Sequence, residues 1–302
     1  MQSNSGLNVS ANSTRFPPFL FDTDPLWLHV ECGIYSNKLG FLGGISWALL
    51  VVRVCQFYPD QGAERIVHHF FSFYEGWDWV RKPLCVSNIE PEQTFRGIMP
   101  IITPTIPCTN SAFNVIRSTL WKMTKEITKA AGVVLEIERN PQQHSWEELF
   151  TAYDPFTEFQ YFVRVQLSGN TEALARAWSN FVESQLRKLA AELERTPPIL
   201  HAIPVVTPFK DPSVPLATNF LLGVRLEDGR PPHAEVNLTN PIQNFLFSIR
   251  GFTKFNQQET HIEITWATRY VSLIDQGSFI LSPSISLMTL IQRYCSRFLC
   301  ET

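Results

Sequence analysis

The sequence predicts an α+β fold, in which a helical domain is followed by a ferredoxin-like domain with the element order βαββαβ. Three observations lead to this prediction. Helical patterns predominate over residues 27–150, the pattern changes to strand-like alternation after residue 155, and 44% of the 302 residues are hydrophobic. That hydrophobic content is enough to form a core in each of two domains.

The first two helices are predicted from the spacing of apolar residues. From Gly44 onward such residues recur every three to five positions, and Pro59 follows as a stop. The apolar stripe of this helix is formed by Ile45, Leu49, Val52 and Phe57. A second helix is expected over residues 63–74, where several phenylalanines face inward. Both helices therefore belong to one apolar core.

The remainder of the helical domain contains an extended segment and a third helix. Residues 99–107 are expected to be extended, because three closely spaced prolines fix the backbone and remove hydrogen-bond donors. The third helix is expected over residues 111–132. Ser145 and Glu148 then form a predicted capping box, in which each side chain bonds the other's exposed backbone amide. The domain is expected to end near residues 153–155.

Strand patterns dominate the second domain. Residues 159–167 alternate as a strand, and the turn after Gly169 leads into a long amphipathic helix that stops at Pro197-Pro198. Further strands are expected over residues 200–206, 220–226 and 261–267, with a helix over residues 241–249. This order is that of a split βαβ sandwich.

The chain is expected to divide into four segments. These are a flexible or misassigned leader at 1–26, the helical domain at 27–150, the βαββαβ domain at 151–275 and an unassigned tail at 276–302. The formal net charge of -3 argues against a protein that coats nucleic acid by bulk electrostatics, so RNA contact would need a local basic patch. The longest apolar run, residues 45–54, is shorter than the ~20 residues that span a bilayer, so no membrane contact is predicted.

Three blocks of sequence resemble eukaryotic poly(A) polymerases. Residues 35–47 read YSNKLGFLGGISW and continue into VVRVCQFYP at residues 51–59. The block WSNFVESQLR at residues 178–187 is similar to a helix of the family's RNA-binding domain, and MPIITPTIP at residues 99–107 is similar to a loop near its nucleotide pocket. The resemblance covers residues 27–270. It implies a central helical domain and an RRM-like RNA-binding domain, without the N-terminal catalytic nucleotidyltransferase domain.

The resemblance also implies a set of nucleotide-binding residues, with ATP as the substrate. Tyr35 and Asn37 would contact the nucleotide, and Gly44 and Ile45 would offer it their backbone. A helix that begins at Gly44 or Ile45 directs unpaired amides and the positive end of its dipole outward, which suits a triphosphate. Without the resemblance, Gly43 and Gly44 would simply permit tight helix packing and Tyr35 would be a buried aromatic residue.

No catalytic or metal-binding residues are expected in this sequence. Nucleotidyl transfer uses two divalent ions held by carboxylates, and the resemblance implies Mg²⁺ or Mn²⁺ in the intact enzyme. The pair Asp22 and Asp24 lacks a preceding Gly-Ser turn and is followed by Pro25, so we interpret it as a solvated turn. Leu26 stands where the family has a phosphate-binding lysine, which weakens the expected triphosphate contact.

The implied function is that of a nuclear polynucleotide adenylyltransferase, which adds AMP from ATP to mRNA 3′ ends during polyadenylation. Its partners would be the RNA 3′ end and cleavage and polyadenylation factors. This polypeptide is expected to bind ATP and RNA but to be inactive alone. One alternative is a non-catalytic RNA-binding or interaction protein that diverged from the family, and another is a chain whose catalytic segment lies upstream. The segment Arg250–Phe255 matches the RNA-stacking motif of RRM domains poorly, and we interpret this similarity as a chance match.

Overall fold

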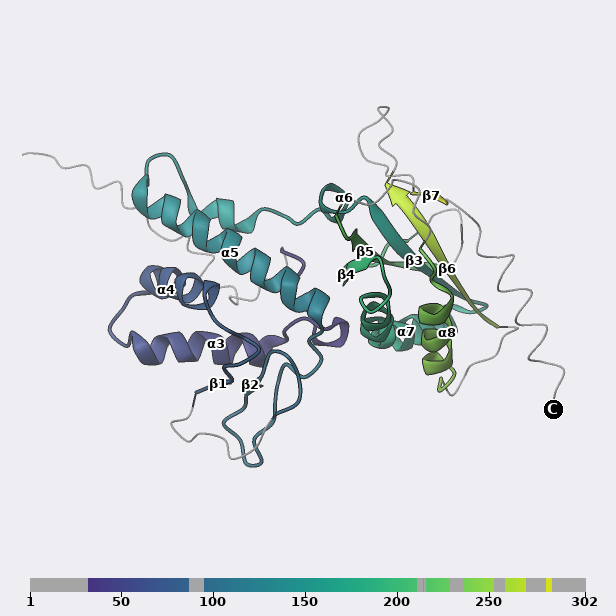
Figure 1. Cartoon of the computed structure of the whole chain (residues 1–302), viewed down its shortest axis with the longest axis horizontal. Coiled ribbons are helices and arrows are strands. Elements are labelled where there is room, and N and C mark those ends of the chain that lie inside the picture. Colours follow the sequence, from purple (N-terminus) through teal and green to yellow (C-terminus); the bar gives the residue numbers. More distant parts are fainter. Residues whose placement is uncertain are drawn as a thin grey trace, which may run out of the picture.

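The computed structural model describes residues 32–86, 95–210, 214, 216–228, 236–252, 259–269 and 281–283. Figure 1 shows a helical part on one side and a sheet part on the other. The helical part contains α3 (Gly44–Phe57), α4 (Ala63–Glu75), α5 (Arg117–Arg139) and the short parallel strands β1 (Leu84–Cys85) and β2 (Ile101–Ile102). The predicted α+β class is confirmed. The leader at 1–26, with its Asp22 and Asp24 pair and Leu26, lies outside the described residues.

Helices α3 and α4 pack through buried aromatic side chains. Tyr74 of α4 is fully buried and donates its hydroxyl to the carbonyl oxygen of Leu50 on α3 at 2.8 Å. Trp79 stacks on the Tyr74 ring with the centroids 5.2 Å apart. Because burial raises the pKa of the Tyr74 hydroxyl, this group remains a neutral donor and the hydrogen bond persists across the physiological pH range.

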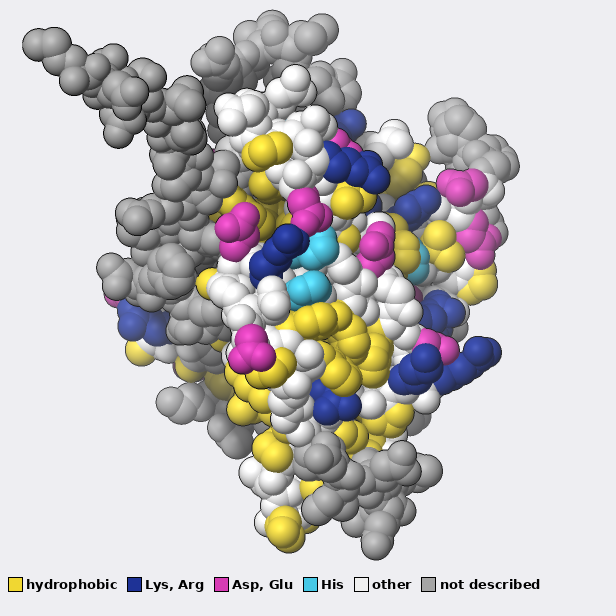
Figure 2. Space-filling model, turned by 90° about the vertical axis from the view of Figure 1, so that its left-hand side faces the viewer, with side chains coloured by type: hydrophobic (Ala, Val, Ile, Leu, Met, Phe, Trp, Pro, Cys, Tyr) yellow, Lys and Arg dark blue, Asp and Glu magenta, His cyan; other side chains and the backbone are white. Residues whose placement is uncertain are grey.

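The helix predicted from Gly44 onward is confirmed, but the apolar residues that predicted it do not lie on one buried face. Leu49 is buried, but Ile45, Val52 and Phe57 are 60%, 45% and 50% exposed. The buried apolar residues of the helix are Trp47, Leu49, Leu50 and Val54. Apolar residues occupy most faces of α3, so their spacing alone does not show which face is buried. The buried face is the one that contacts α4. Figure 2 shows hydrophobic side chains gathered on the outer side of the helical part.

Helix α5 begins and ends later than predicted. Residues 111–114 form turns, held by Asn110, whose side-chain oxygen accepts the Ala112 N–H at 2.9 Å and the Ile101 N–H at 3.0 Å. The helix then continues past Gly132, which is exposed and has no atom close to the position of an added Cβ. A glycine inside a helix costs about 1 kcal/mol relative to alanine. Burial of Val134 and Ile137 beyond it offsets this cost.

The extended segment predicted for the helical domain is confirmed, as is the bond from Ser145 to Glu148 in the predicted capping box. Residues 99–107 contain no helix and contribute only β2. The N–H of Ser145 donates to Glu148 Oε1 at 2.9 Å, at the start of the 3-10 helix η2 (Trp146–Phe150). A one-turn helix, α6 (Pro155–Glu158), then leads into the sheet.

The sheet part has the predicted βαββαβ order. Its elements are β3 (Tyr161–Gly169), α7 (Glu172–Leu193), β4 (Ile199–Pro204), β5 (Thr218–Leu226), α8 (Thr239–Ile249) and β6 (Thr260–Arg269). The strand order is β4-β5-β3-β6-β7 and neighbouring strands are antiparallel. Helices α7 and α8 cover one face (Figure 1). Trp178 of α7 is fully buried and donates its indole N–H to the His261 carbonyl at 3.1 Å, which ties the helix to β6.

Two segments after α8 bear on the sequence predictions. Phe252 packs against Trp178 and Phe181, with ring centroids 5.2 and 5.1 Å apart, so this ring of the poorly matching motif belongs to the core. Residues 253–255 of that motif lie outside the described residues. Within the predicted tail, β7 (Leu281–Pro283) pairs with β6 and extends the sheet. Among the described helices, each is too short or too polar to cross a lipid bilayer.

Candidate functional site

Tyr35, Asn37 and the start of α3 lie together in one corner of the helical part. A Cβ atom added to Gly44 would lie 3.5 Å from Tyr35 Oη, and one added to Gly43 would lie 3.3 Å from Asn37 Cβ. Side chains at these two positions would therefore fill the space beside Tyr35 and Asn37. We call Tyr35, Asn37, Gly43, Gly44 and Ile45 the α3 corner.

The α3 corner is open to solvent. Ile45 is exposed, and its other four residues are half-buried. Helix α3 begins after Gly43 without a side-chain cap, so its first-turn amides are not satisfied by a capping side chain. Such a helix start has a partial positive charge and exposed N–H donors, which favour an anionic ligand such as a phosphate.

Local turns bring Tyr35 and Asn37 to this position. A parallel bridge pairs Tyr35 with Leu42, and the 3-10 helix η1 (Asn37–Leu39) lies between them. Gly40 ends η1 with a φ of 93°, in the left-handed region that favours glycine. The sequence YSNKLGFLGG therefore folds back on itself and places its polar residues beside its glycines.

The segment before α5 fixes the orientation of the Asn37 side chain. Asn114 Nδ2 donates to Asn37 Oδ1 at 2.8 Å and to the Asn37 carbonyl at 3.2 Å, and Asn37 Nδ2 donates to the Ser111 carbonyl at 3.3 Å. The hydroxyl of Ser111 also lies 2.8 Å from that of Ser46. Sequence reasoning missed Ser111 and Asn114. Their only signal was a polar group of residues directly before a predicted helix.

The α3 corner is joined to the sheet part by an ion pair and by a helix cap. Lys38 of η1 pairs with Glu183 of α7 at 2.7 Å. At the C-terminal end of α7, the buried Glu194 accepts hydrogen bonds from the N–H and the hydroxyl of Ser118, each at 2.7 Å. Glu194 therefore caps α5 from a different element. A carboxylate at this position also interacts favourably with the helix dipole.

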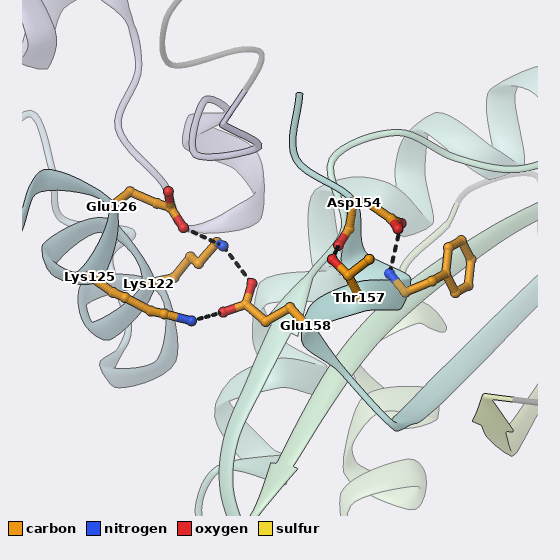
Figure 3. Close-up of polar contacts among 7 residues, drawn as sticks. Lys122, Lys125, Glu126, Asp154, Thr157 and Glu158 are labelled. Atoms are coloured by element: carbon orange, nitrogen blue, oxygen red, sulfur yellow. Dashed lines mark hydrogen bonds and ion pairs between the residues drawn. The ribbon is translucent and has the colours of Figure 1, made fainter. Parts of the chain in front are cut away.

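A buried ion-pair cluster connects α5 to α6 (Figure 3). Lys122 Nζ lies 2.7 Å from Glu126 Oε1 and 2.6 Å from Glu158 Oε2, and the side chain of Lys122 is only 1% exposed. Lys125 reaches the other oxygen of Glu158 at 2.5 Å. Burial opposes ionisation of Glu158, but the hydrogen bonds and charges of the two lysines outweigh it and lower the pKa of Glu158. Glu158 therefore stays ionised at neutral pH.

The position of Glu158 is set by the short helix that carries it. Asp154 Oδ1 accepts the N–H of Phe156 at 2.9 Å and so caps α6 (Figure 3). The ring of Tyr153 lies 3.8 Å below the Lys122 ammonium, which adds a cation–π contact to the cluster. Residues 153–158 thus form a fixed link between the helical part and the sheet part.

The described residues do not provide a site for the divalent ions of nucleotidyl transfer. Among them there is no group of three or more His, Cys, Asp or Glu side chains placed to hold a metal. The acids near the α3 corner are engaged elsewhere, since Glu183 pairs with Lys38 and Glu194 binds Ser118.

Comparison with known proteins divides the chain into the same two parts as the fold, the helical part and the sheet part. Residues 25–152 match the family model of the poly(A) polymerase central domain, and residues 154–215 match that of the poly(A) polymerase predicted RNA binding domain. The chain is 34% identical to the poly(A) polymerase of Dictyostelium discoideum, over 76% of this chain and 30% of that protein. It is 38% identical to nuclear poly(A) polymerase 2 of Arabidopsis thaliana, over 78% of this chain and 30% of that protein.

A third relative is nuclear poly(A) polymerase 1 of Arabidopsis thaliana, at 32% identity over 73% of this chain and 33% of that protein. The chain thus spans about a third of the length of the curated relatives that it matches. Both family models lie in chain order on the helical part and the sheet part described above. The chain therefore belongs to the poly(A) polymerase family, and it carries that family's central and RNA-binding parts.

Proposed function

We propose that this chain is the ATP- and RNA-binding part of a nuclear enzyme that adds AMP to mRNA 3′ ends. ATP would bind at the α3 corner, where Tyr35 and Asn37 contact the nucleotide and the backbone of Gly44 and Ile45 faces its phosphates. The observation that supports this assignment is the uncapped start of α3 beside two half-buried polar side chains. A phosphate could reach these amides because no side chain stands on Gly43 or Gly44.

Membership in the family supports the rest of the proposal. The relatives carry the names poly(A) polymerase and nuclear poly(A) polymerase, from which we propose the substrate ATP, the polyadenylation reaction and the nuclear location. The RNA 3′ end would be held by the sheet part, and cleavage and polyadenylation factors are proposed as further partners. In the whole enzyme, Mg²⁺ or Mn²⁺ would be held by residues other than those described.

Replacing Gly44 by glutamate is expected to weaken ATP binding at least about tenfold, which corresponds to about 1.4 kcal/mol. The new carboxylate would repel the phosphates and occupy the space beside Tyr35 Oη, 3.5 Å from the added Cβ. Isothermal titration of ATP against wild type and Gly44→Glu measures the effect. Gly62→Glu is a matched control, because Gly62 precedes α4 and has no atom within 4 Å of an added Cβ.

Equal, weak ATP binding by wild type and Gly44→Glu would contradict a nucleotide site at the α3 corner. That outcome would favour the alternative of a non-catalytic RNA-binding or interaction protein. A loss of affinity that is equally large in Gly62→Glu would also contradict the assignment, because it would show that any added negative charge suffices.

The 302-residue polypeptide by itself is expected to add no AMP to RNA. Two-ion catalysis needs clustered carboxylates, and the described residues contain no group of three metal-ligating side chains. The measurement is primer extension on labelled oligo(A) with ATP and either Mg²⁺ or Mn²⁺, with an active poly(A) polymerase as the positive control. An ATP-dependent ladder of longer products would refute this prediction.

A further inference from the structure

Three residues on one face of α5 form a basic and aromatic stripe. Arg117, Trp121 and Lys125 are spaced four residues apart, so their side chains lie along the same side of the helix. Trp121 is half-buried, whereas Arg117 and Lys125 are exposed. The Lys125 ammonium lies 5.2 Å from the centroid of the Trp121 ring. The stripe faces the sheet part, where Lys125 also reaches Glu158 (Figure 3).

The sheet part contributes two residues to the same place. His201 of β4 stacks on Trp121, with ring centroids 4.4 Å apart and planes 18° from parallel. Arg225 of β5 is opposite His201 in the strand ladder, and its guanidinium lies 5.4 Å from the centroid of the Trp121 ring. We call Arg117, Trp121, Lys125, His201 and Arg225 the seam cluster, because it draws on both parts of the chain.

The seam cluster has positive charge that is not fully neutralised. Within the described residues, no ion pair joins Arg225 to a carboxylate, and Arg117 donates to the backbone carbonyl of Glu194 at 2.5 Å. Burial and the positive charges of Arg225 and Arg117 lower the pKa of His201 to about 4. The His201 ring is therefore neutral at pH 7, and the positive charges of Arg225 and Arg117 both act on this ring.

We propose that the seam cluster binds the phosphates of single-stranded RNA, with Arg225 and Arg117 as the contacting groups. The proposal rests on the proposed RNA-binding function and assigns a surface to it. Arginine binds phosphate through a planar set of donors, and positive charge beside aromatic side chains is a common combination in proteins that bind single strands. His201 lies within residues 154–215, which match the predicted RNA binding domain. An RNA held here would lie across the junction of the two parts.

An acidic protein segment is the competing ligand for such a surface. RNA is favoured because the cluster includes His201, which lies within the match to the predicted RNA binding domain, and because its two guanidinium groups come from different elements, α5 and β5. A backbone with regularly repeated phosphates can contact both groups in sequence. The test below therefore includes both kinds of polyanion.

Replacing Arg225 by glutamine is expected to weaken RNA binding about fivefold at 0.1 M salt. Each phosphate contact to a single strand contributes about 0.7 to the slope of log K against log salt concentration, and its loss should lower the slope by that amount. The measurement is fluorescence anisotropy of a labelled 15-nucleotide oligo(A) titrated with the full 302-residue chain from about 0.05 to 0.2 M salt. Arg117→Gln is expected to act in the same direction, and the double variant more strongly than either.

Arg176→Gln is the matched control, because Arg176 is an exposed arginine of α7 paired with Glu172, and the substitution removes the same charge. Its affinity and slope should match those of wild type. If wild type fails to bind oligo(A), the proposed RNA-binding function itself is wrong. If wild type binds and Arg225→Gln behaves like Arg176→Gln, the RNA function stands and the seam cluster is overturned as its site. Poly-glutamate is the second polyanion tested. If Arg225→Gln abolishes the binding of poly-glutamate but leaves the affinity for oligo(A) unchanged, the proposal is also overturned.

Discussion

Replacing Lys122 by methionine should lower the free energy of unfolding by about 3 kcal/mol. The substitution keeps the length of the side chain but removes a charge that is 1% exposed and lies between Glu126 and Glu158. Those two carboxylates, only 12% and 13% exposed, would then face each other, and Lys125 would remain as the partner of Glu158. Breaking a buried ion pair from one side is strongly destabilising, because the remaining charge is left without compensation.

The measurement is urea unfolding followed by circular dichroism at pH 7. Lys129→Met is the matched control, since Lys129 is an exposed lysine on the same helix and its loss should change stability by less than about 0.5 kcal/mol. The triple variant Lys122→Met, Glu126→Gln, Glu158→Gln should recover much of the loss, because neutral groups replace the whole cluster. A Lys122→Met protein as stable as wild type would show that the cluster contributes little to joining the two parts.

Replacing Glu194 by alanine should lower the free energy of unfolding by about 2 kcal/mol. Glu194 is buried and accepts two hydrogen bonds from Ser118, whose hydroxyl in turn accepts the N–H of Ala202 at 2.9 Å. The substitution would leave the first turn of α5 without its cap and would remove a favourable charge near the helix dipole. Because Ala202 belongs to β4, the effect should reach the junction of the two parts.

Scanning calorimetry is the suitable measurement, since it reports both stability and cooperativity. For domains of this size, about 2 kcal/mol corresponds to a fall in Tm of about 5 °C. Glu136→Ala on α5 removes an exposed carboxylate in an i,i+3 pair and should leave the Tm unchanged within about a degree. Glu194→Gln should be intermediate, because it keeps an acceptor but loses the charge. A Glu194→Ala protein that melts like Glu136→Ala would rule out an energetic role for this cap.

Stability at the junction matters for the proposed function because the same elements support both candidate sites. The turn that contains Asn114 holds Asn37 in the α3 corner, and Ser118 follows in the first turn of α5. Arg117 and Trp121 of the seam cluster lie on that same part of α5. Loosening the start of α5 is therefore expected to affect the α3 corner and the seam cluster together.

Short-range signals predicted much of the fold correctly. Pro59 and the apolar residues before it predicted the end of α3, and the turn after Gly169 predicted the start of α7. The change from helical to alternating spacing predicted the βαββαβ order that the sheet topology confirms. The start of α5 was misplaced, because side-chain bonds of Asn110 and Asn114 hold residues 111–114 in turns, and such long-range bonds leave no periodic pattern.

The sequence by itself determined the family and the α+β class, because each depends on residue identity over short stretches, and the four residues expected to contact the nucleotide stay a prediction. Tertiary structure alone decided which face of α3 is buried, since that helix is apolar on most sides and only its contact with α4 selects Leu50 and Val54. It also decided the partners of Lys122 and Glu194. Glu158 lies 36 positions from Lys122, and Ser118, through which Glu194 caps α5, lies 76 positions from Glu194. Pairing over such separations is fixed by how helices and strands pack, and no local pattern encodes it.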